Sequence, residues 1–291
     1  MIDIDFESLK KPNFWSCVSL KKYFNIMKKK AEGEDISRDK REILENIIKR
    51  MDLPSGIEER LNEIRAALIS CNYEVKDIKI KALSRVLVGT AETFGEIPFE
   101  IGLCFDPIMN IPYIPGSTIK GAVSSATYNL LYKSKVKELA EQKDEETVRR
   151  EAKEYAENEC RRIFGGGKNE NGGIGLIGFT DAYPVRKGKF LLYPDVMTPH
   201  YTDETRNELE VMPNPIIYFT IAPETEFRFF MFYRKHRGKR GLSSRDLADY
   251  PTERELGIVD RGLFYAFIRG VGAKTALGYS RFEILNYEKV V

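Results

Sequence analysis

Apolar residues in the first quarter of the chain recur every three to four positions, which is the spacing of an amphipathic helix. Leu61, Ile64 and Leu68 form one such stripe. Ser55 precedes it and is followed three residues later by a glutamate, which predicts a capping box at the start of this helix. Residues 1–75 are therefore expected to form an N-terminal helical extension.

After residue 75 the pattern changes to short apolar segments rich in β-branched and aromatic residues, with two amphipathic helices between them. Strands are predicted within residues 78–89, 99–105, 175–184, 188–194, 214–236 and 278–287. Helices are predicted from residue 117 and within residues 253–270. The order strand, helix, strands, helix, strand predicts an α+β fold over residues 76–291, with a ferredoxin-like (RRM-like) β-α-β-β-α-β core and insertions.

The first of these helices follows the segment PGSTIKGA, and Ser117 is predicted to be its N-cap. The charged stretch 133–162 is expected to continue the helix as a solvated face. Gly116, Ser117 and Thr118 would then lie at a helix N-terminus, where backbone N–H groups attract anions. Lys120 in the first turn favours an anion nearby, and ordinary helix capping is the alternative interpretation.

The second helix is followed by the glycine-rich segment GVGAKTALGYSRF, Gly270 to Phe282. It lacks the adjacent Gly-Lys pair and the strand–loop–helix context of a nucleotide-binding P-loop. A tight turn with a solvated lysine is one interpretation. The other is a phosphate site, where glycine backbone approaches the ligand and Lys274, Thr275 and Arg281 supply donors. Because both loops adjoin helices that pack on one sheet, we expect them to line one groove.

Composition argues against several kinds of chemistry. The 46 Lys and Arg nearly balance the 44 Asp and Glu, for a net charge of +2, so only local clusters of charge can indicate a partner. Two histidines and four dispersed cysteines, without a CxxC pair, argue against a metal centre or a histidine-based triad. The first residues do not resemble a signal peptide and no apolar run reaches membrane-spanning length, so we expect a cytoplasmic protein without cofactor or metal.

Four segments occur in an order that resembles the RAMP superfamily of CRISPR RNA-binding proteins: SRVLVG, IPYIPGSTIKGAV, IFGGG with GLIGFTDAYP, and GVGAKTALGYSRF. The resemblance covers residues 78–285 and is greatest to the sixth RAMP subunit of the type III-B Cmr effector complex. It implies a ferredoxin-like core, binding of CRISPR guide RNA through the RNA backbone toward the 3′ end of the guide, and assembly with other Cmr subunits. By position, it implies RNA contacts at Ser84, Arg85, Gly116, Ser117, Thr118, Lys120, Gly270, Gly272, Lys274, Thr275 and Gly278.

A basic cluster follows the aromatic segment FRFFMFY and consists of Arg234, Lys235, Arg237, Lys239 and Arg240. Cations beside aromatic residues are typical of surfaces that bind single-stranded nucleic acid. We expect the aromatic side chains themselves to lie in the core and the cations, Arg237 and Lys239 among them, to face RNA. An acidic surface of a partner protein is the alternative.

These observations favour a non-catalytic RNA-binding subunit over an enzyme. One alternative is a RAMP endoribonuclease that processes CRISPR transcripts, with His200 or His236 as its catalytic histidine. Another is cleavage of target RNA by Asp106 or Asp181 with a divalent ion, although Asp181 is expected to cap or turn the chain. Asp106 stands where many members of the family carry histidine, so no family role is carried over to it.

Overall fold

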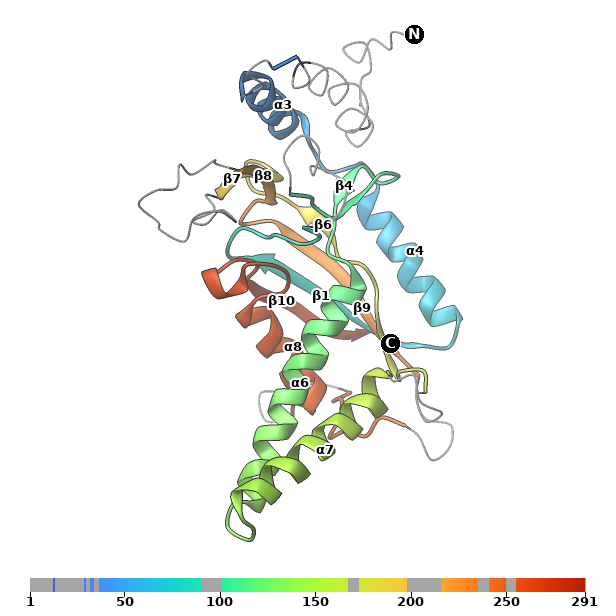
Figure 1. Cartoon of the computed structure of the whole chain (residues 1–291). Coiled ribbons are helices and arrows are strands. Elements are labelled where there is room, and N and C mark those ends of the chain that lie inside the picture. Colours follow the sequence, from blue (N-terminus) through green and yellow to red (C-terminus); the bar gives the residue numbers. More distant parts are fainter. Residues whose placement is uncertain are drawn as a thin grey trace, which may run out of the picture.

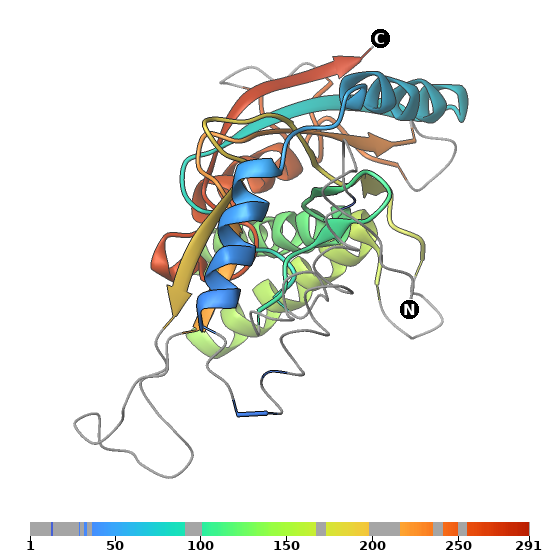
Figure 2. The ribbon, with the colours of Figure 1, turned by 90° about the horizontal axis from the view of Figure 1, so that it is seen from above.

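The computed structural model describes residues 13, 29, 32–33, 37–90, 101–166, 173–197, 216–234, 241–249 and 255–290 (Figure 1 and Figure 2). Its helices are α3 (Ser37–Arg50), α4 (Ile57–Ser70), α6 (Gly116–Leu139), α7 (Glu145–Phe164), α8 (Ile258–Arg269) and the short 3-10 helix η2 (Thr275–Leu277). Its strands are β1 (Glu74–Ala82), β3 (Phe105–Asp106), β4 (Ile111–Pro112), β5 (Ile177–Phe179), β6 (Tyr183–Arg186), β7 (Leu192–Met197), β8 (Ile216–Ile221), β9 (Glu226–Tyr233) and β10 (Phe282–Val290). Among these residues, no helix is long and apolar enough to cross a membrane.

The central sheet is antiparallel and has the strand order β10-β1-β9-β5, with β6 also paired to β9. Along the chain, α6 lies between β1 and β5, and α8 lies between β9 and β10. This connectivity, with β1 and β9 adjacent in the middle of the sheet, fits a ferredoxin-like unit. The predicted α+β core is confirmed, and β3–β4 and β7–β8 are two-stranded insertions.

Helices cover both faces of this sheet (Figure 2). α6 and α8 pack together on one face, and α4 lies on the other face against β1 and β9. Phe229 of β9 lies 5.7 Å from the ring of Phe267 in α8. The next residue, Phe230, packs with Ile57 and Leu61 of α4. The aromatic residues of β9 therefore lie in the core, as the sequence predicts.

Arg228 anchors α4 to the sheet. Its guanidinium donates to the Asp77 carboxylate of β1 at 2.5 Å, and to Glu58 and Asn62 of α4 at 2.7 and 3.0 Å. The Arg228 side chain is only 7% exposed, so this ion pair is shielded from water. This contact holds α4 over β1 and β9.

α6 and α8 approach each other closely because Gly262 lies at their contact. A Cβ atom at this glycine would lie 2.2 Å from Oγ1 of Thr127 in α6. The two helices run so that the first turns of α6 lie beside the loop that follows α8. This packing positions the candidate site.

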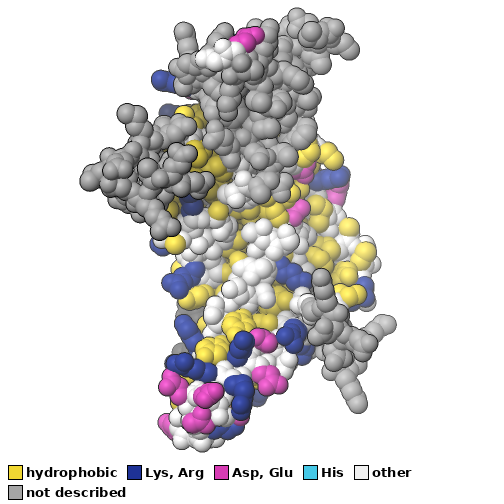
Figure 3. Space-filling model, in the orientation of Figure 1, with side chains coloured by type: hydrophobic (Ala, Val, Ile, Leu, Met, Phe, Trp, Pro, Cys, Tyr) yellow, Lys and Arg dark blue, Asp and Glu magenta, His cyan; other side chains and the backbone are white. Residues whose placement is uncertain are grey.

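Two predictions about helix ends were wrong. α4 begins after Gly56, which has a left-handed φ of 84°, and no side chain caps it, so Ser55 forms no capping box. The helix predicted to run through the charged stretch ends at Leu139, and α7 begins after a new N-cap, Asp144, whose carboxylate accepts from the Thr147 N–H at 2.9 Å. Cations and anions are intermingled over the end of this helical hairpin, as expected for a solvated face (Figure 3).

Two predicted strands are shorter than expected. The strand predicted over residues 78–89 ends at Ala82, because the chain then leaves the sheet to pair with the glycine-rich loop. The strand predicted over residues 99–105 contributes only Phe105 to β3 within the described residues. The two strands predicted in residues 214–236 are present as β8 and β9, but β8 pairs with β7 and not with β9.

Candidate nucleic-acid interface

The two loops with candidate phosphate ligands meet at one groove of about 460 Å³. The groove is lined by Val88, Gly89, Thr118, Gly121, Ala122, Gly270, Gly272, Ala273 and Thr275. One side comes from the start of α6 and the other from the loop after α8, so the expected shared groove is confirmed. Every lining side chain is small, which lets an extended ligand approach the main chain closely.

Gly270 and Gly272 shape the loop against its own chain. Their φ values, 117° and 130°, lie in the region that favours glycine. A Cβ atom at Gly272 would lie 2.5 Å from the carbonyl oxygen of Leu87, and one at Gly270 would lie 2.8 Å from the side chain of Thr275. These glycines are therefore required by packing inside the protein.

Several backbone N–H groups of the loop are already hydrogen-bonded. The N–H of Ala273 donates to the carbonyl of Leu87 at 2.8 Å, and that of Ser280 donates to the carbonyl of Arg85 at 2.8 Å. The interpretation that a row of exposed N–H groups receives phosphates is wrong for these positions. Hydroxyl groups, cations and the main-chain groups that form no such bond are what the loops can still offer a ligand.

The N-terminus of α6 carries its own anion. The N–H of Gly116 donates to Oδ1 of Asp181 at 2.7 Å, across 65 positions of sequence. The N-cap is Pro115, and Ser117 is exposed and makes no capping hydrogen bond. The prediction that Ser117 caps the helix is therefore wrong, and the cap comes from Asp181, for which only a local cap or turn was expected. The N–H of Gly116 at this helix end is therefore occupied by a carboxylate and is not available to a phosphate.

Lys274 belongs to a polar cluster that connects the loop to β7 and β8. Its ammonium donates to the Tyr218 hydroxyl at 2.6 Å. The hydroxyls of Tyr218 and Tyr279 donate to Oδ2 of Asp195 at 3.1 and 2.6 Å. Arg85 donates to Oδ1 of the same carboxylate at 2.7 Å. These five residues are called the Asp195 cluster below.

The Asp195 cluster holds both phenols in their protonated form. Burial raises the pKa of Tyr218 and of Tyr279 above the ordinary tyrosine value, and the nearby Asp195 carboxylate raises both further. A protonated Tyr218 can donate to Asp195 and accept from Lys274 at the same time. The interpretation of Lys274 as a merely solvated side chain is wrong, and its contact with RNA stays a prediction.

Two cations of these loops are available to an anionic ligand. Lys120 lies in α6 between the groove residues Thr118 and Gly121, and Arg281 is exposed where the loop ends. Neither side chain forms a hydrogen bond or ion pair with the residues that the structure describes. They remain the best cationic candidates of the expected set.

Gly121 was missed by the sequence analysis. It lies within α6, and a Cβ atom built on it would meet nothing within 4 Å. Glycine inside a helix costs about 0.5–1 kcal/mol relative to alanine, and no contact here requires it. Gly121 lines the groove, and a side chain at this position would have open space around it. The available signal was an isolated glycine inside a predicted helix, which often has a functional reason.

Those expected RNA-binding residues that the structure describes divide into two groups. The groove is lined by Thr118, Gly270, Gly272 and Thr275. Outside its lining lie Ser84, Arg85, Gly116, Ser117, Lys120, Lys274, Gly278 and Arg281. RNA contact at any of these positions stays a prediction.

Both carboxylates considered as metal ligands have structural partners. Asp106 accepts from the N–H of Ile108 at 2.8 Å and from the hydroxyl of Tyr183 at 2.7 Å, and Asp181 caps α6. Across the part of the chain that the structure describes, no group of three or more His, Cys, Asp or Glu could hold a metal ion. Outside the described residues lie Arg237, Lys239, His200 and His236, so nothing is assigned to them.

Comparison with known proteins agrees with the resemblance seen in the motifs. A model of the RAMP superfamily matches residues 79–283. The chain is 32% identical over 93% of its length to the CRISPR system CMR subunit Cmr6 of Saccharolobus solfataricus, of which it covers 81%. It is 28% identical over 70% of its length to Cmr6 of Pyrococcus furiosus, of which it covers 66%.

A solved structure also matches nearly the whole chain. It is a chain of the cryo-EM structure of the type III-B Cmr-beta complex bound to cognate target RNA. The two chains are 28% identical and superpose with a TM-score of 0.67, over 96% of this chain and 93% of the other.

Proposed function

Because the chain belongs to the RAMP superfamily and, within it, to the Cmr6 subunits of type III-B CRISPR complexes, we propose that it is a non-catalytic subunit that binds CRISPR guide RNA. It contacts the RNA backbone toward the 3′ end of the guide and assembles with other Cmr subunits. The Cmr-beta complex that contains a similar chain is bound to target RNA, which supports RNA as the ligand class.

The groove between α6 and the glycine-rich loop carries this proposal. Its lining of glycine, alanine, threonine and valine offers main chain and two hydroxyls, from Thr118 and Thr275. Such groups contact phosphate and sugar and do not read base edges, so they give no sequence preference. Lys120 and Arg281 add unpaired positive charge to the two loops.

Binding of unrelated RNAs tests the ligand class. Single-stranded RNAs of equal length and different sequence should bind the full chain with affinities within about tenfold of one another. The logarithm of the affinity should fall linearly with the logarithm of salt concentration, with a slope of about 0.7 per neutralised phosphate. Strong selection for one short motif would contradict backbone binding.

Incubation of labelled RNA with the pure protein tests the absence of catalysis. The proposal rests on the structural engagement of Asp106 and Asp181, which leaves neither carboxylate as a ready metal ligand. RNA should remain intact with Mg²⁺ or Mn²⁺. Cleavage that disappears in Asp106→Ala or His236→Ala would identify an endoribonuclease instead.

Gly121→Leu tests the groove itself. The leucine side chain would occupy the groove, so RNA affinity should fall by about tenfold or more. The melting temperature should not fall, because leucine favours a helix over glycine. Asn129→Leu is the matched control: it adds the same side chain at an exposed position two turns later in α6, outside the groove lining. Equal RNA binding by both variants would rule out the groove as the RNA site.

A further inference from the structure

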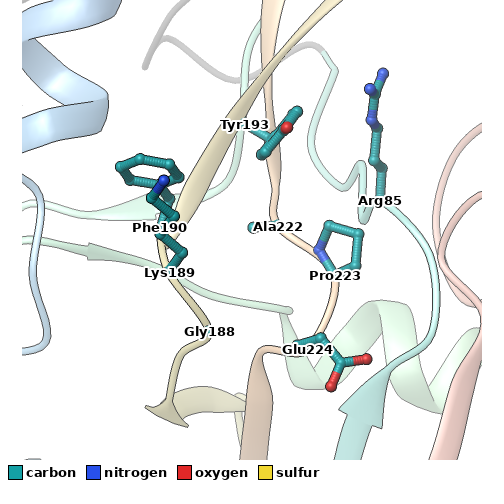
Figure 4. Close-up of a pocket in the computed structure, with 8 residues that line it drawn as sticks. All are labelled: Arg85, Gly188, Lys189, Phe190, Tyr193, Ala222, Pro223 and Glu224. Carbon is teal, nitrogen blue, oxygen red and sulfur yellow. The ribbon is translucent and has the colours of Figure 1, made fainter.

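A second hollow of about 480 Å³ lies beside β7, and its lining includes Arg85, Lys189, Phe190, Tyr193 and Glu224 (Figure 4). It shares no lining residue with the groove. We propose that this hollow binds a nucleobase of the RNA whose backbone the groove holds, an inference that rests on the proposed function.

Exposed planar groups make the hollow suitable for stacking. Tyr193 is 41% exposed on β7, and the guanidinium carbon of Arg85 lies 5.2 Å from the centre of its ring. Phe190 adds a second ring, with the ammonium of Lys189 at 5.3 Å from its centre. Bases that leave a helical stack bind to proteins on aromatic rings and on arginine planes.

The stacking surface is held in place before a ligand arrives. Arg85 donates to Oδ1 of Asp195, whose side chain is only 8% exposed, at 2.7 Å. The carbonyl of Tyr193 accepts from the Thr220 hydroxyl at 3.1 Å, which fixes the strand beneath the ring. Groups that are already ordered lose little conformational freedom on binding.

The polar groups around the hollow match a nucleotide better than an aliphatic side chain. Lys189 forms no ion pair with a described residue and can contact a phosphate. The carboxylate of Glu224, which pairs with Lys81 at 2.5 Å, is an acceptor for the amino groups of bases. Pro223 adds an apolar surface to the lining of the hollow. A planar, partly apolar ligand with polar edges and a phosphate uses all of these groups.

One chain segment connects the two sites, and this favours RNA over a partner protein. Arg85 lines the hollow and Val88 lines the groove. Their Cα atoms are three residue steps apart along the chain, which span at most about 11 Å. A nucleotide adjoining those in the groove can therefore place its base against Tyr193.

Photochemical crosslinking tests the proposal. The full chain is mixed with single-stranded RNA that carries 5-iodouridine, irradiated, and digested for mass spectrometry. We expect a crosslink at Tyr193 or Phe190. Tyr193→Leu should remove the Tyr193 crosslink and weaken RNA binding by about fivefold or more, whereas Tyr193→Phe should retain both. Tyr155→Leu is the matched control, because Tyr155 of α7 is also 41% exposed and lies outside the hollow.

The possible outcomes separate this site from the groove. RNA that binds normally, with crosslinks only at other places and no effect of Tyr193→Leu, would overturn the base site and leave the groove intact. A wild-type chain that binds no RNA would overturn both. If Tyr193→Leu leaves RNA affinity unchanged but weakens association with Cmr subunits, the hollow binds a protein and the proposal is wrong.

Discussion

The ammonium group of Lys274 lies 2.6 Å from the hydroxyl oxygen of Tyr218 and 4.6 Å from the centre of its ring. Lys274 also has a φ of 55°, which is uncommon for a residue other than glycine. The backbone of the glycine-rich loop is therefore strained at the residue whose side chain connects it to β8. The hydroxyl of Tyr218 also donates to Asp195, so Lys274 is connected to β7 as well.

Lys274→Ala should lower the free energy of unfolding by about 1–2 kcal/mol, because a hydrogen bond from a charged donor is lost. Urea denaturation measures this change. Tyr218→Phe removes the other partner, so the double variant should be less destabilised than the sum of the single variants. Additive effects would show that the two side chains do not interact in solution. An unchanged free energy of unfolding in Lys274→Ala would show that the lysine is merely solvated.

Gly272→Ala should destabilise the protein by about 1–3 kcal/mol. The alanine Cβ would meet the carbonyl of Leu87 at 2.5 Å, on a backbone with a φ of 130°. Gly278→Ala is the control, because Gly278 also has a positive φ, 87°, but nothing lies within 4 Å of its Cβ position. Thermal melting of both variants should show the larger loss for Gly272. Equal losses would mean that backbone strain alone determines the effect.

Arg228→Met should lower the free energy of unfolding by about 3 kcal/mol, because it leaves the carboxylate of Asp77 buried without its main partner. Adding Asp77→Leu should recover part of the loss. Arg60→Met, which removes an exposed arginine from the 3.5 Å ion pair with Glu63 on α4, should change stability by less than about 0.5 kcal/mol. Denaturant titration of the three proteins checks this ranking, and a loss for Arg60→Met as large as for Arg228→Met would contradict it.

Stability should fall as pH rises above about 10. Among the residues that the structure describes, burial raises the folded-state pKa of six tyrosines above their ordinary value of 10.0, and these are Tyr128, Tyr183, Tyr218, Tyr233, Tyr279 and Tyr287. Above that value the unfolded phenols lose protons that the folded ones keep, so the stabilisation present below pH 10 is lost with increasing pH. Unfolding titrations between about pH 8 and 11 measure this loss of stability, and the absorbance of tyrosinate measures the ionisation of the phenols.

Lys76 acts in the opposite direction in the same pH range. Burial lowers its pKa below 10.5, so the unfolded chain binds more protons there and this one contribution grows with pH. The loss of stability from the six phenols should outweigh the gain from one ammonium group. Stability that increases steadily from pH 9 to 11 would show that Lys76 dominates and that the phenols ionise freely.

The sequence predicts those features that depend on nearby residues. The stripe of Leu61 with its neighbours and the strand–helix order identify the core, because burial follows local periodicity. The capping of α6 could not be predicted in this way, since Gly116 is bonded to Asp181 across 65 positions. The direction of Lys274 likewise depends on Tyr218 and Asp195, which come from two other strands.

One local signal was overlooked. Asp144 is followed by two glutamates and a threonine, a sequence typical of a helix start, yet the helix was predicted to continue through it. The high density of Lys, Glu and Arg on both sides hid the break, because all three residues favour helices.

Gly262 and Thr127 determine the spacing of two helices whose ends carry the two sides of the groove. Gly262 precedes Gly270 by eight residues, most of them helical, a distance of about 12 Å. The helices are stiff over that length, so a change in their spacing at this contact also changes the spacing of their ends. The width of the groove therefore depends on two residues that do not line it. Substitutions at Gly262 or Thr127 can therefore change the affinity for a ligand in the groove while every residue that lines the groove remains the same.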